Sequence, residues 1–121
     1  MSVTVGSVTF DCGDALVVGR FWSEVLGRPL DNAPMPPSRD FASIGRDEPS
    51  QNGFMFIRVP EGKSTKNRLH LDLESNDVAG DVARLTALGA TPIHEKAEFG
   101  HTWTTLADPE GNEFCISPPH Q

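Results

Sequence analysis

The stretch from residue 68 to residue 89, RLHLDLESNDVAGDVARLTALG, decides how this chain folds. Its first part alternates strictly between apolar and polar residues. The two rows are Leu69, Leu71 and Leu73 on one side and His70, Asp72 and Glu74 on the other. Because side chains along a strand point alternately to opposite faces, this period of two predicts a half-buried β-strand.

The second part of the stretch changes to a helical period. Its apolar residues recur every three or four positions, which predicts an amphipathic helix over residues 76–88. Asn76 or Asp77 is placed to cap the first turn, and Gly89 stands where a left-handed residue ends a helix. The stretch is therefore predicted to be a strand followed directly by a helix.

The same unit occurs earlier, with a strand over 3–11 and a helix over 14–26. Asp14 lies 62 positions before Asn76, and Gly27 lies 62 positions before Gly89, so the two helices are expected to be equally long. On the strands the better offset is 63, which matches Ser7 with His70. Gly19 inside the first helix suggests a close approach to a sheet. The chain is predicted to contain a duplicated module.

The rest of the chain supplies short strands and loops. Further strands are expected at 41–45, 54–59, 91–94, 102–106 and 113–117, with a short one beginning at 28–30. The Pro-rich segment 31–40 and the polar segment 61–67 are expected to be irregular loops, and DPEGN at 108–112 a turn. The order is βαβββ twice, which predicts an α+β fold. We expect one domain, 1–121, with modules at about 1–60 and about 67–121.

Composition excludes several classes of protein. The 121 residues carry a formal net charge of −7, which argues against binding nucleic acid or an anionic membrane. No apolar run is long enough to cross a bilayer, and the first residues do not resemble an export signal. The two cysteines, Cys12 and Cys115, are expected to be reduced thiols. We predict a cytoplasmic protein.

Several motifs together resemble the vicinal oxygen chelate superfamily. They are Phe21-Trp22, HLDL at 70–73, LTALGAT at 85–91 and LADPEGNEFCI at 106–116. This superfamily contains glyoxalases, bleomycin-resistance proteins and extradiol dioxygenases, and the chain most resembles its small glyoxalase-like domain proteins. The resemblance implies paired βαβββ modules whose strands curl into a cupped, partly open barrel around a cavity.

The resemblance also implies where a metal would bind in this chain. Metal-dependent members place one ligand on each of four strands, and the matching positions here are Ser7, Ile57, His70 and Cys115. The usual set of histidines and glutamates is missing, because Ile57 has no ligand atom and Ser7 offers only a weak hydroxyl. We therefore expect no metal cofactor. The alternative is a divalent ion on His70 and Cys115, helped by Asp72 or Glu113 from about 7 Å further along the strands.

The candidate ligand-binding residues edge the implied cavity. They are Thr9, Ile57, His70, Asp72, Trp103 and Cys115. His70 is also the candidate catalytic residue, because an imidazole titrates near neutral pH and can transfer protons. We expect His70 and Cys115 to approach each other. The alternatives are that Asp72 belongs to a solvated strand face, that Cys115 is packed as a small apolar residue, and that Trp103 is an interface anchor. The basic residues of 63–68 either attract an anionic ligand or are simply solvated.

Three functions remain open. The first is a metal-free protein that binds or sequesters a small organic ligand. The second is a lyase, isomerase or dioxygenase with a non-standard metal site or with His70 as acid–base group. The third is a non-catalytic interaction module. We also expect a homodimer, because two small modules leave sheet edges uncovered; Trp103 and the loops 31–40 and 61–67 would then lie near the subunit boundary.

Overall fold

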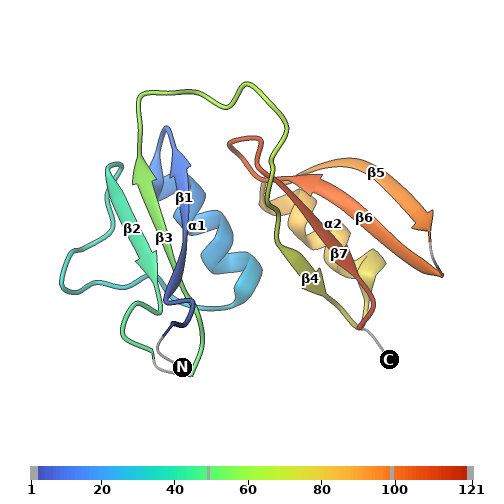
Figure 1. Cartoon of the computed structure of the whole chain (residues 1–121), viewed down its shortest axis with the longest axis horizontal. Coiled ribbons are helices and arrows are strands. Elements are labelled where there is room, and N and C mark those ends of the chain that lie inside the picture. The colour runs from blue at the N-terminus through green and yellow to red at the C-terminus, as the bar shows by residue number, and fades with distance from the viewer. Residues whose placement is uncertain (1–2, 49, 99, 120–121) are drawn as a thin grey trace. The chain divides into compact units, whose positions relative to one another are not determined.

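A computed structural model describes residues 3–48, 50–98 and 100–119 (Figure 1). The chain forms two compact units, Met1–Gly62 and Lys63–Gln121. The boundary between them falls inside the segment 61–67, which was predicted to be a polar loop. In the described part of the chain, no helix is long and apolar enough to cross a membrane.

The first unit is a three-stranded sheet with one helix. Its elements are β1 (Ser7–Cys12), α1 (Ala15–Leu26), β2 (Phe41–Ile44) and β3 (Gly53–Arg58). The strand order is β1-β3-β2, with β1 parallel and β2 antiparallel to β3. The short strand that was expected to begin at 28–30 is reduced to a single bridge between Leu30 and Ile44.

Helix α1 forms where the sequence places its end signals. The Asp14 carboxylate accepts hydrogen bonds from the backbone N–H groups of Leu16 and Val17, and Gly27 ends the helix in the left-handed region with φ of 65°. The buried side of the helix contains Val18, Phe21, Trp22 and Val25. A Cβ at Gly19 would lie 3.1 Å from the Ala42 Cβ, so the predicted close approach of helix and sheet is confirmed.

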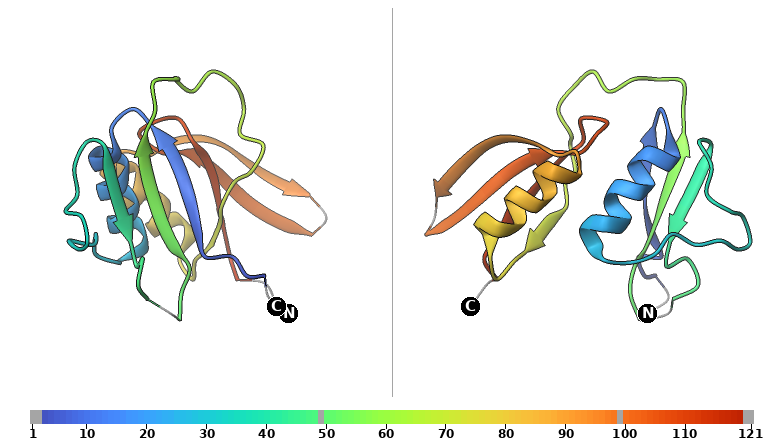
Figure 2. Two further views of the ribbon diagram at one scale, coloured as in Figure 1. Left: turned by 60° about the vertical axis from the view of Figure 1, so that its left-hand side comes forward. Right: turned by 180° about the vertical axis from the view of Figure 1, so that it is seen from behind.

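The second unit is a four-stranded sheet with one helix. Its elements are β4 (Asp72–Glu74), α2 (Val78–Leu88), β5 (Thr91–Glu98), β6 (His101–Ala107) and β7 (Glu113–Ser117). The strand order is β4-β7-β6-β5, with β4 parallel to β7 and the other pairs antiparallel. In each unit the helix covers one face of its sheet, as the view from behind shows (Figure 2).

The DPEGN segment forms the turn that joins β6 to β7. The Asp108 carboxylate is 3% exposed and accepts hydrogen bonds from the backbone N–H groups of Glu110 and Asn112 and from the Asn112 amide. Gly111 has φ of 88°, which glycine adopts without strain. The predicted turn is confirmed, and it fixes how β6 and β7 pair.

Several sequence expectations about the element ends are wrong. The first strand begins at Ser7 rather than at Val3, which is 80% exposed. The strand expected from Leu69 begins at Asp72, and Leu69 is also 80% exposed. The helices differ by one residue in length, because Asp77 and not Asn76 caps α2. In the first two cases apolar alternation is present, but no neighbouring strand pairs with those residues.

The α+β class and the two-module organisation are confirmed. The second unit has the full βαβββ order, and the first has it with its second strand reduced to one bridge. Neither sheet closes on itself, since each ends in two strands that pair on one side only among the described residues. The organisation as one domain stays a prediction.

Candidate functional site

The second sheet presents a row of polar side chains on the face that α2 does not cover. Asp72 pairs with Cys115, and Cys115 pairs with Thr105 on the next strand. Paired residues point to the same face, and residues two apart on one strand do so too. Trp103 therefore shares the face of Thr105. The intervening side chains, Leu106, Phe114 and Ile116, are buried in the core.

Three side chains that can bind a metal ion or form hydrogen bonds lie close together on this face. One ligand atom each from His70, Asp72 and Cys115 lies within 4.8 Å of the other two. His70 Nδ1 lies 3.1 Å from Asp72 Oδ1, and their side chains are 43% and 70% exposed. The expectation that His70 and Cys115 approach each other is confirmed. We call these three residues the His-Asp-Cys cluster.

The Thr105 hydroxyl contacts the thiol of this cluster. Its hydroxyl oxygen lies 3.4 Å from Cys115 Sγ, and the residue is 7% exposed. A hydroxyl in this place can donate a hydrogen bond to a thiolate sulfur. The sequence analysis missed Thr105, although the alternation Trp103, Thr105, Ala107 would have placed it on the same face as Trp103.

Glu113 lies next to the cluster but is held by other groups. Its carboxylate accepts a hydrogen bond of 2.9 Å from the Asn67 backbone N–H and faces the ammonium groups of Lys63 and Lys66 at 3.9 and 3.8 Å. The Asn67 hydrogen bond holds the pKa of Glu113 below its ordinary value; burial opposes this, and Lys66, Lys63 and His70 add to it. The lysines of the 61–67 loop thus have an acidic partner within the chain.

The donor set of the cluster fits a divalent metal ion. Imidazole nitrogen, thiolate sulfur and carboxylate oxygen are the ligands that zinc takes in proteins, and three of them leave a fourth position open. All three side chains are reachable from solvent. If an ion binds here, it would act as a Lewis acid on a ligand oxygen at the open position.

The first unit has no comparable group at the matching positions. The Ser7 hydroxyl donates to Met55 Sδ at 3.8 Å, and Ile57 is a half-buried apolar residue opposite Asp11. Thr9 pairs with Met55 and is exposed. Both Thr9 and Ile57 lie on the face of their sheet that is opposite to the Phe10 and Phe56 rings of the core, which are 5.2 Å apart.

The sheet register also changes the repeat alignment. Cys115 is paired with Asp72, which lies two residues after His70. In the first unit the residue two after Ser7 is Thr9, and its partner is Met55. The structural counterpart of Cys115 is therefore Met55 and not Ile57. The sequence alignment of β3 with β7 was displaced by two residues.

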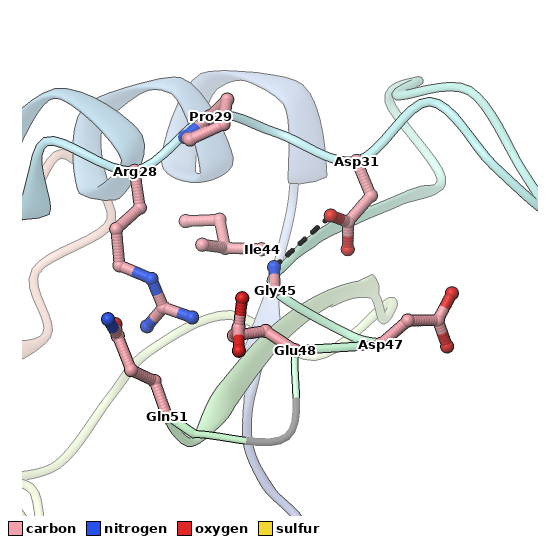
Figure 3. Close-up of a pocket in the computed structure, with 8 residues that line it drawn as sticks. All are labelled: Arg28, Pro29, Asp31, Ile44, Gly45, Asp47, Glu48 and Gln51. Carbon is pink, nitrogen blue, oxygen red and sulfur yellow. Dashed lines mark hydrogen bonds between the residues drawn. The ribbon is translucent and has the colours of Figure 1, made fainter.

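A pocket of about 390 Å³ opens elsewhere in the first unit (Figure 3). It is lined by Arg28, Pro29, Asp31, Ile44, Gly45, Asp47, Glu48 and Gln51, none of which was a predicted site residue. The Asp31 carboxylate is occupied by the Ser43 hydroxyl and by the N–H groups of Gly45 and Arg46.

Among the described residues that line this pocket, Arg28 is the only cation, and its guanidinium is partly engaged within the chain. Arg28 Nη1 donates to the Asn52 carbonyl at 2.9 Å, and Arg28 Nη2 is buried from solvent without a hydrogen-bond partner among the described residues. Because Nη2 is not accessible to water, it is not accessible to a molecule in the pocket either. The His-Asp-Cys cluster is therefore the stronger candidate for the functional site.

A family model assigns the chain to a known family. The glyoxalase-like domain family model matches residues 7–117, so the chain belongs to the glyoxalase-like domain family of the vicinal oxygen chelate superfamily. No curated protein sequence matches the chain significantly.

Solved structures match nearly the whole chain. A glyoxalase/bleomycin resistance protein/dioxygenase family enzyme from Burkholderia phytofirmans has a TM-score of 0.74 at 21% identity, over 96% of this chain and 98% of that one. The fosfomycin resistance protein FosX from Listeria monocytogenes, complexed with Mn(II) and dihydroxypropylphosphonic acid, has a TM-score of 0.75 at 11% identity (99% and 93% covered). The bleomycin-binding protein from Streptomyces verticillus, complexed with copper(II)-bleomycin, has a TM-score of 0.64 at 17% identity (99% and 100% covered). At these identities the likeness establishes the fold alone.

Proposed function

We propose that this chain is a small-molecule-binding protein that holds or sequesters an organic ligand on the helix-free face of its second sheet. The convergence of the His-Asp-Cys cluster carries this proposal. An exposed imidazole, an exposed carboxylate and a half-buried thiol lie together, with the half-buried Trp103 on the same face. An aromatic surface beside a few polar groups is typical of ligand sites.

Two further observations support the binding of an organic ligand. The first unit offers only Ser7, Thr9, Met55 and Ile57 at or near the family's ligand positions, so a site with one strong ligand from each of four strands is incomplete. Two solved proteins of the same fold are described with small molecules bound, copper(II)-bleomycin in one and a phosphonic acid together with Mn(II) in the other. We propose that His70, Asp72, Trp103 and Cys115 contact this ligand; Thr9 and Ile57, which lie in the first unit, stay predicted ligand-binding residues.

Protein-observed NMR tests this proposal. A library of small organic compounds is screened against the ¹⁵N-labelled chain. We expect hits to shift the amide signals of β4, β6 and β7, and we expect these shifts to be lost in His70→Ala and Cys115→Ser. Glu95→Gln is a matched control, because it removes an exposed carboxylate that is not part of the proposed site. Glu95 lies on β5 and pairs with Thr104, which belongs to the helix-covered face of the sheet. Shifts confined to other strands, or unchanged in both variants, would contradict the proposal.

A second candidate function is acid–base catalysis by His70. The contact of His70 Nδ1 with Asp72 Oδ1 at 3.1 Å favours it, because a carboxylate that accepts the Nδ1 proton fixes the tautomer and leaves Nε2 free to take a proton. If this holds, mass spectrometry of a bound compound will show conversion over time. His70→Ala would then abolish conversion while compounds that contact Trp103 still bind; an unaltered compound after prolonged incubation supports the binding function instead.

We further propose that the protein acts as a homodimer in the cytoplasm. The eight residues of β5 are all exposed, and this strand pairs only with β6 in the described part of the chain. A long uncovered edge favours pairing with another chain. Sedimentation velocity at micromolar concentration tests the dimer, and a concentration-independent mass near 13.1 kDa would contradict it.

A further inference from the structure

We propose that the second unit binds one thiophilic divalent cation of the zinc type through His70, Asp72 and Cys115, with no ligand from the first unit. This deepens the proposed function, on which it rests for the choice of site. It departs from the ligand pattern of the metal-dependent relatives, because Asp72 is not at one of the four matching positions and a single module supplies every protein ligand.

The distances fit an ion with small rotations of side chains. Zinc bonds of about 2.0–2.3 Å in tetrahedral geometry separate two ligand atoms by about 3.3–3.7 Å. His70 Nδ1 and Asp72 Oδ1 are already 3.1 Å apart, and all three ligand atoms lie within 4.8 Å of one another. Closing the largest gap takes about 1 Å, and the exposed His70 and Asp72 side chains have room to move.

The paired strands place two of the three groups, Asp72 and Cys115, side by side without the ion. Asp72 and Cys115 are register partners on parallel strands, and the Cys115 backbone N–H donates to the Leu71 carbonyl at 2.9 Å. His70 lies two residues before Asp72, so the long imidazole side chain spans the distance that separates their Cα atoms. A site built on paired strands pre-organises its ligands and lowers the entropic cost of binding.

The donor atoms select the class of ion. A thiolate and an imidazole favour zinc, cobalt and related ions, whereas calcium and magnesium prefer oxygen ligands. The Thr105 hydroxyl, 3.4 Å from Cys115 Sγ, can donate to the metal-bound thiolate, as outer groups commonly do around zinc ligands. Three protein ligands would leave a fourth position for an oxygen of water or of an organic ligand.

The first unit is not needed for this site. Ser7 is engaged with the Met55 thioether, and Ile57 has no ligand atom in its side chain. This gives the proposal its sharpest consequence. Substitutions in the second unit alone should change metal binding, whereas the family's four-strand arrangement would make Ser7 matter as well.

Cobalt binding to the full chain tests the proposal, with Co²⁺ as a coloured substitute for Zn²⁺. The chelator-treated protein is titrated with Co²⁺ and followed by absorption, since a cobalt–thiolate bond gives a charge-transfer band. We expect one ion per chain. Cys115→Ser should remove the band, and His70→Ala and Asp72→Asn should each weaken binding at least about tenfold. Competition with Zn²⁺ should displace the cobalt.

Three control variants should bind cobalt as the natural chain does. Ser7→Ala tests the first unit, Cys12→Ala tests the other thiol, and Glu95→Gln tests the loss of an exposed carboxylate outside the cluster. The proposal is overturned if binding does not saturate at one ion, if the band survives in Cys115→Ser, if Asp72→Asn binds within about twofold of the natural chain, or if Ser7→Ala weakens binding. Circular dichroism establishes that each variant is folded.

The outcome is separable from that of the proposed function. A chain that binds small organic compounds at the cluster but no cobalt overturns this inference and leaves the proposed function standing. A chain that binds cobalt through the three residues but shows no shifts with organic compounds overturns the proposed function and leaves this inference standing.

Discussion

Asp108→Ala should be among the most destabilising single substitutions in the second unit. The carboxylate is 3% exposed and accepts three hydrogen bonds of 2.9, 3.0 and 3.2 Å, two from backbone N–H groups and one from the Asn112 amide. Removing it leaves these donors without their acceptor inside the turn between β6 and β7. At about 1 kcal/mol for each hydrogen bond, the loss is about 3 kcal/mol of unfolding free energy.

Urea unfolding at pH 7, followed by far-UV circular dichroism, measures this loss. For a chain of this size, about 3 kcal/mol corresponds to a fall in Tm of about 12 °C. Asp108→Asn is the graded control, because its amide oxygen can still accept from both backbone N–H groups while the bond to Asn112 is lost; we expect roughly a third of the effect. Glu95→Ala, at an exposed site, should change stability by no more than about 0.5 kcal/mol.

The reasoning would be refuted by an Asp108→Ala variant that loses less than about 1 kcal/mol. Such a result would mean that water replaces the carboxylate without cost, and that the side chain does not fix the turn. The same variant should also disturb the amide signals of Thr105 and Cys115, because the turn sets the register of the strands that contain them.

Three other predictions concern stability. Leu85→Ala should cost about 2–5 kcal/mol in chemical unfolding, because Leu85 is 1% exposed and the only buried residue of α2; a cost below 1 kcal/mol would mean that α2 contributes little to the core. Glu113→Gln should flatten the acid side of the stability profile: the folded-state pKa of Glu113 is lowered, chiefly by the Asn67 N–H, so its contribution is complete above the ordinary value of 4.5 and is lost as the pH falls through the folded-state pKa. Identical pH profiles for the variant and the natural chain between pH 3 and 7 would argue against this. Gly45→Ala should cost about 1–2 kcal/mol, because φ is +63° and the new Cβ would collide with the Arg28 guanidinium, whereas Gly62→Ala meets no atom within 4 Å and should be nearly neutral by thermal unfolding.

The helices could be predicted from the sequence because their signals are local. Asp14 and Gly27 cap α1 through their own side chain and backbone conformation, so no knowledge of the rest of the chain is needed. The α2 start was ambiguous between Asn76 and Asp77, since both residues can accept from the first turn. In the structure the N-cap is Asp77, whose carboxylate accepts a hydrogen bond from the Gly80 N–H at 3.1 Å.

The strand ends could not be predicted because pairing decides them. Leu69 continues the alternation of Leu71 and Leu73, yet it is 80% exposed, because β7 pairs only with residues from Asp72 onward. The opposite error occurs at β5, which runs to Glu98 although its expected end was His94. There the pairing with β6 continues as far as Glu98 and His101. Alternation shows that a strand can form but not where its neighbour ends.

The candidate site was predicted in part. His70 and Cys115 were placed together, but Asp72 was expected to begin about 7 Å away along the strand. That distance holds for Cα atoms on one strand. It does not hold for the side-chain tips, because His70 reaches toward Asp72 and Cys115 is the lateral neighbour of Asp72. Knowledge of the register between β4 and β7 was needed to see the three residues as one group.

The repeat itself indicates why the candidate site lies in the second unit. The parallel pair of β1 and β3 reproduces the pair of β4 and β7, so Ser7, Thr9 and Met55 correspond to His70, Asp72 and Cys115. Two of the first three side chains also meet, since the Ser7 hydroxyl donates to Met55 Sδ at 3.8 Å. A hydroxyl, a hydroxyl and a thioether are weak ligands and poor acid–base groups, whereas an imidazole, a carboxylate and a thiol are strong ones. One backbone arrangement thus occurs twice, and the side chains able to bind a metal or a polar ligand are concentrated in its second copy.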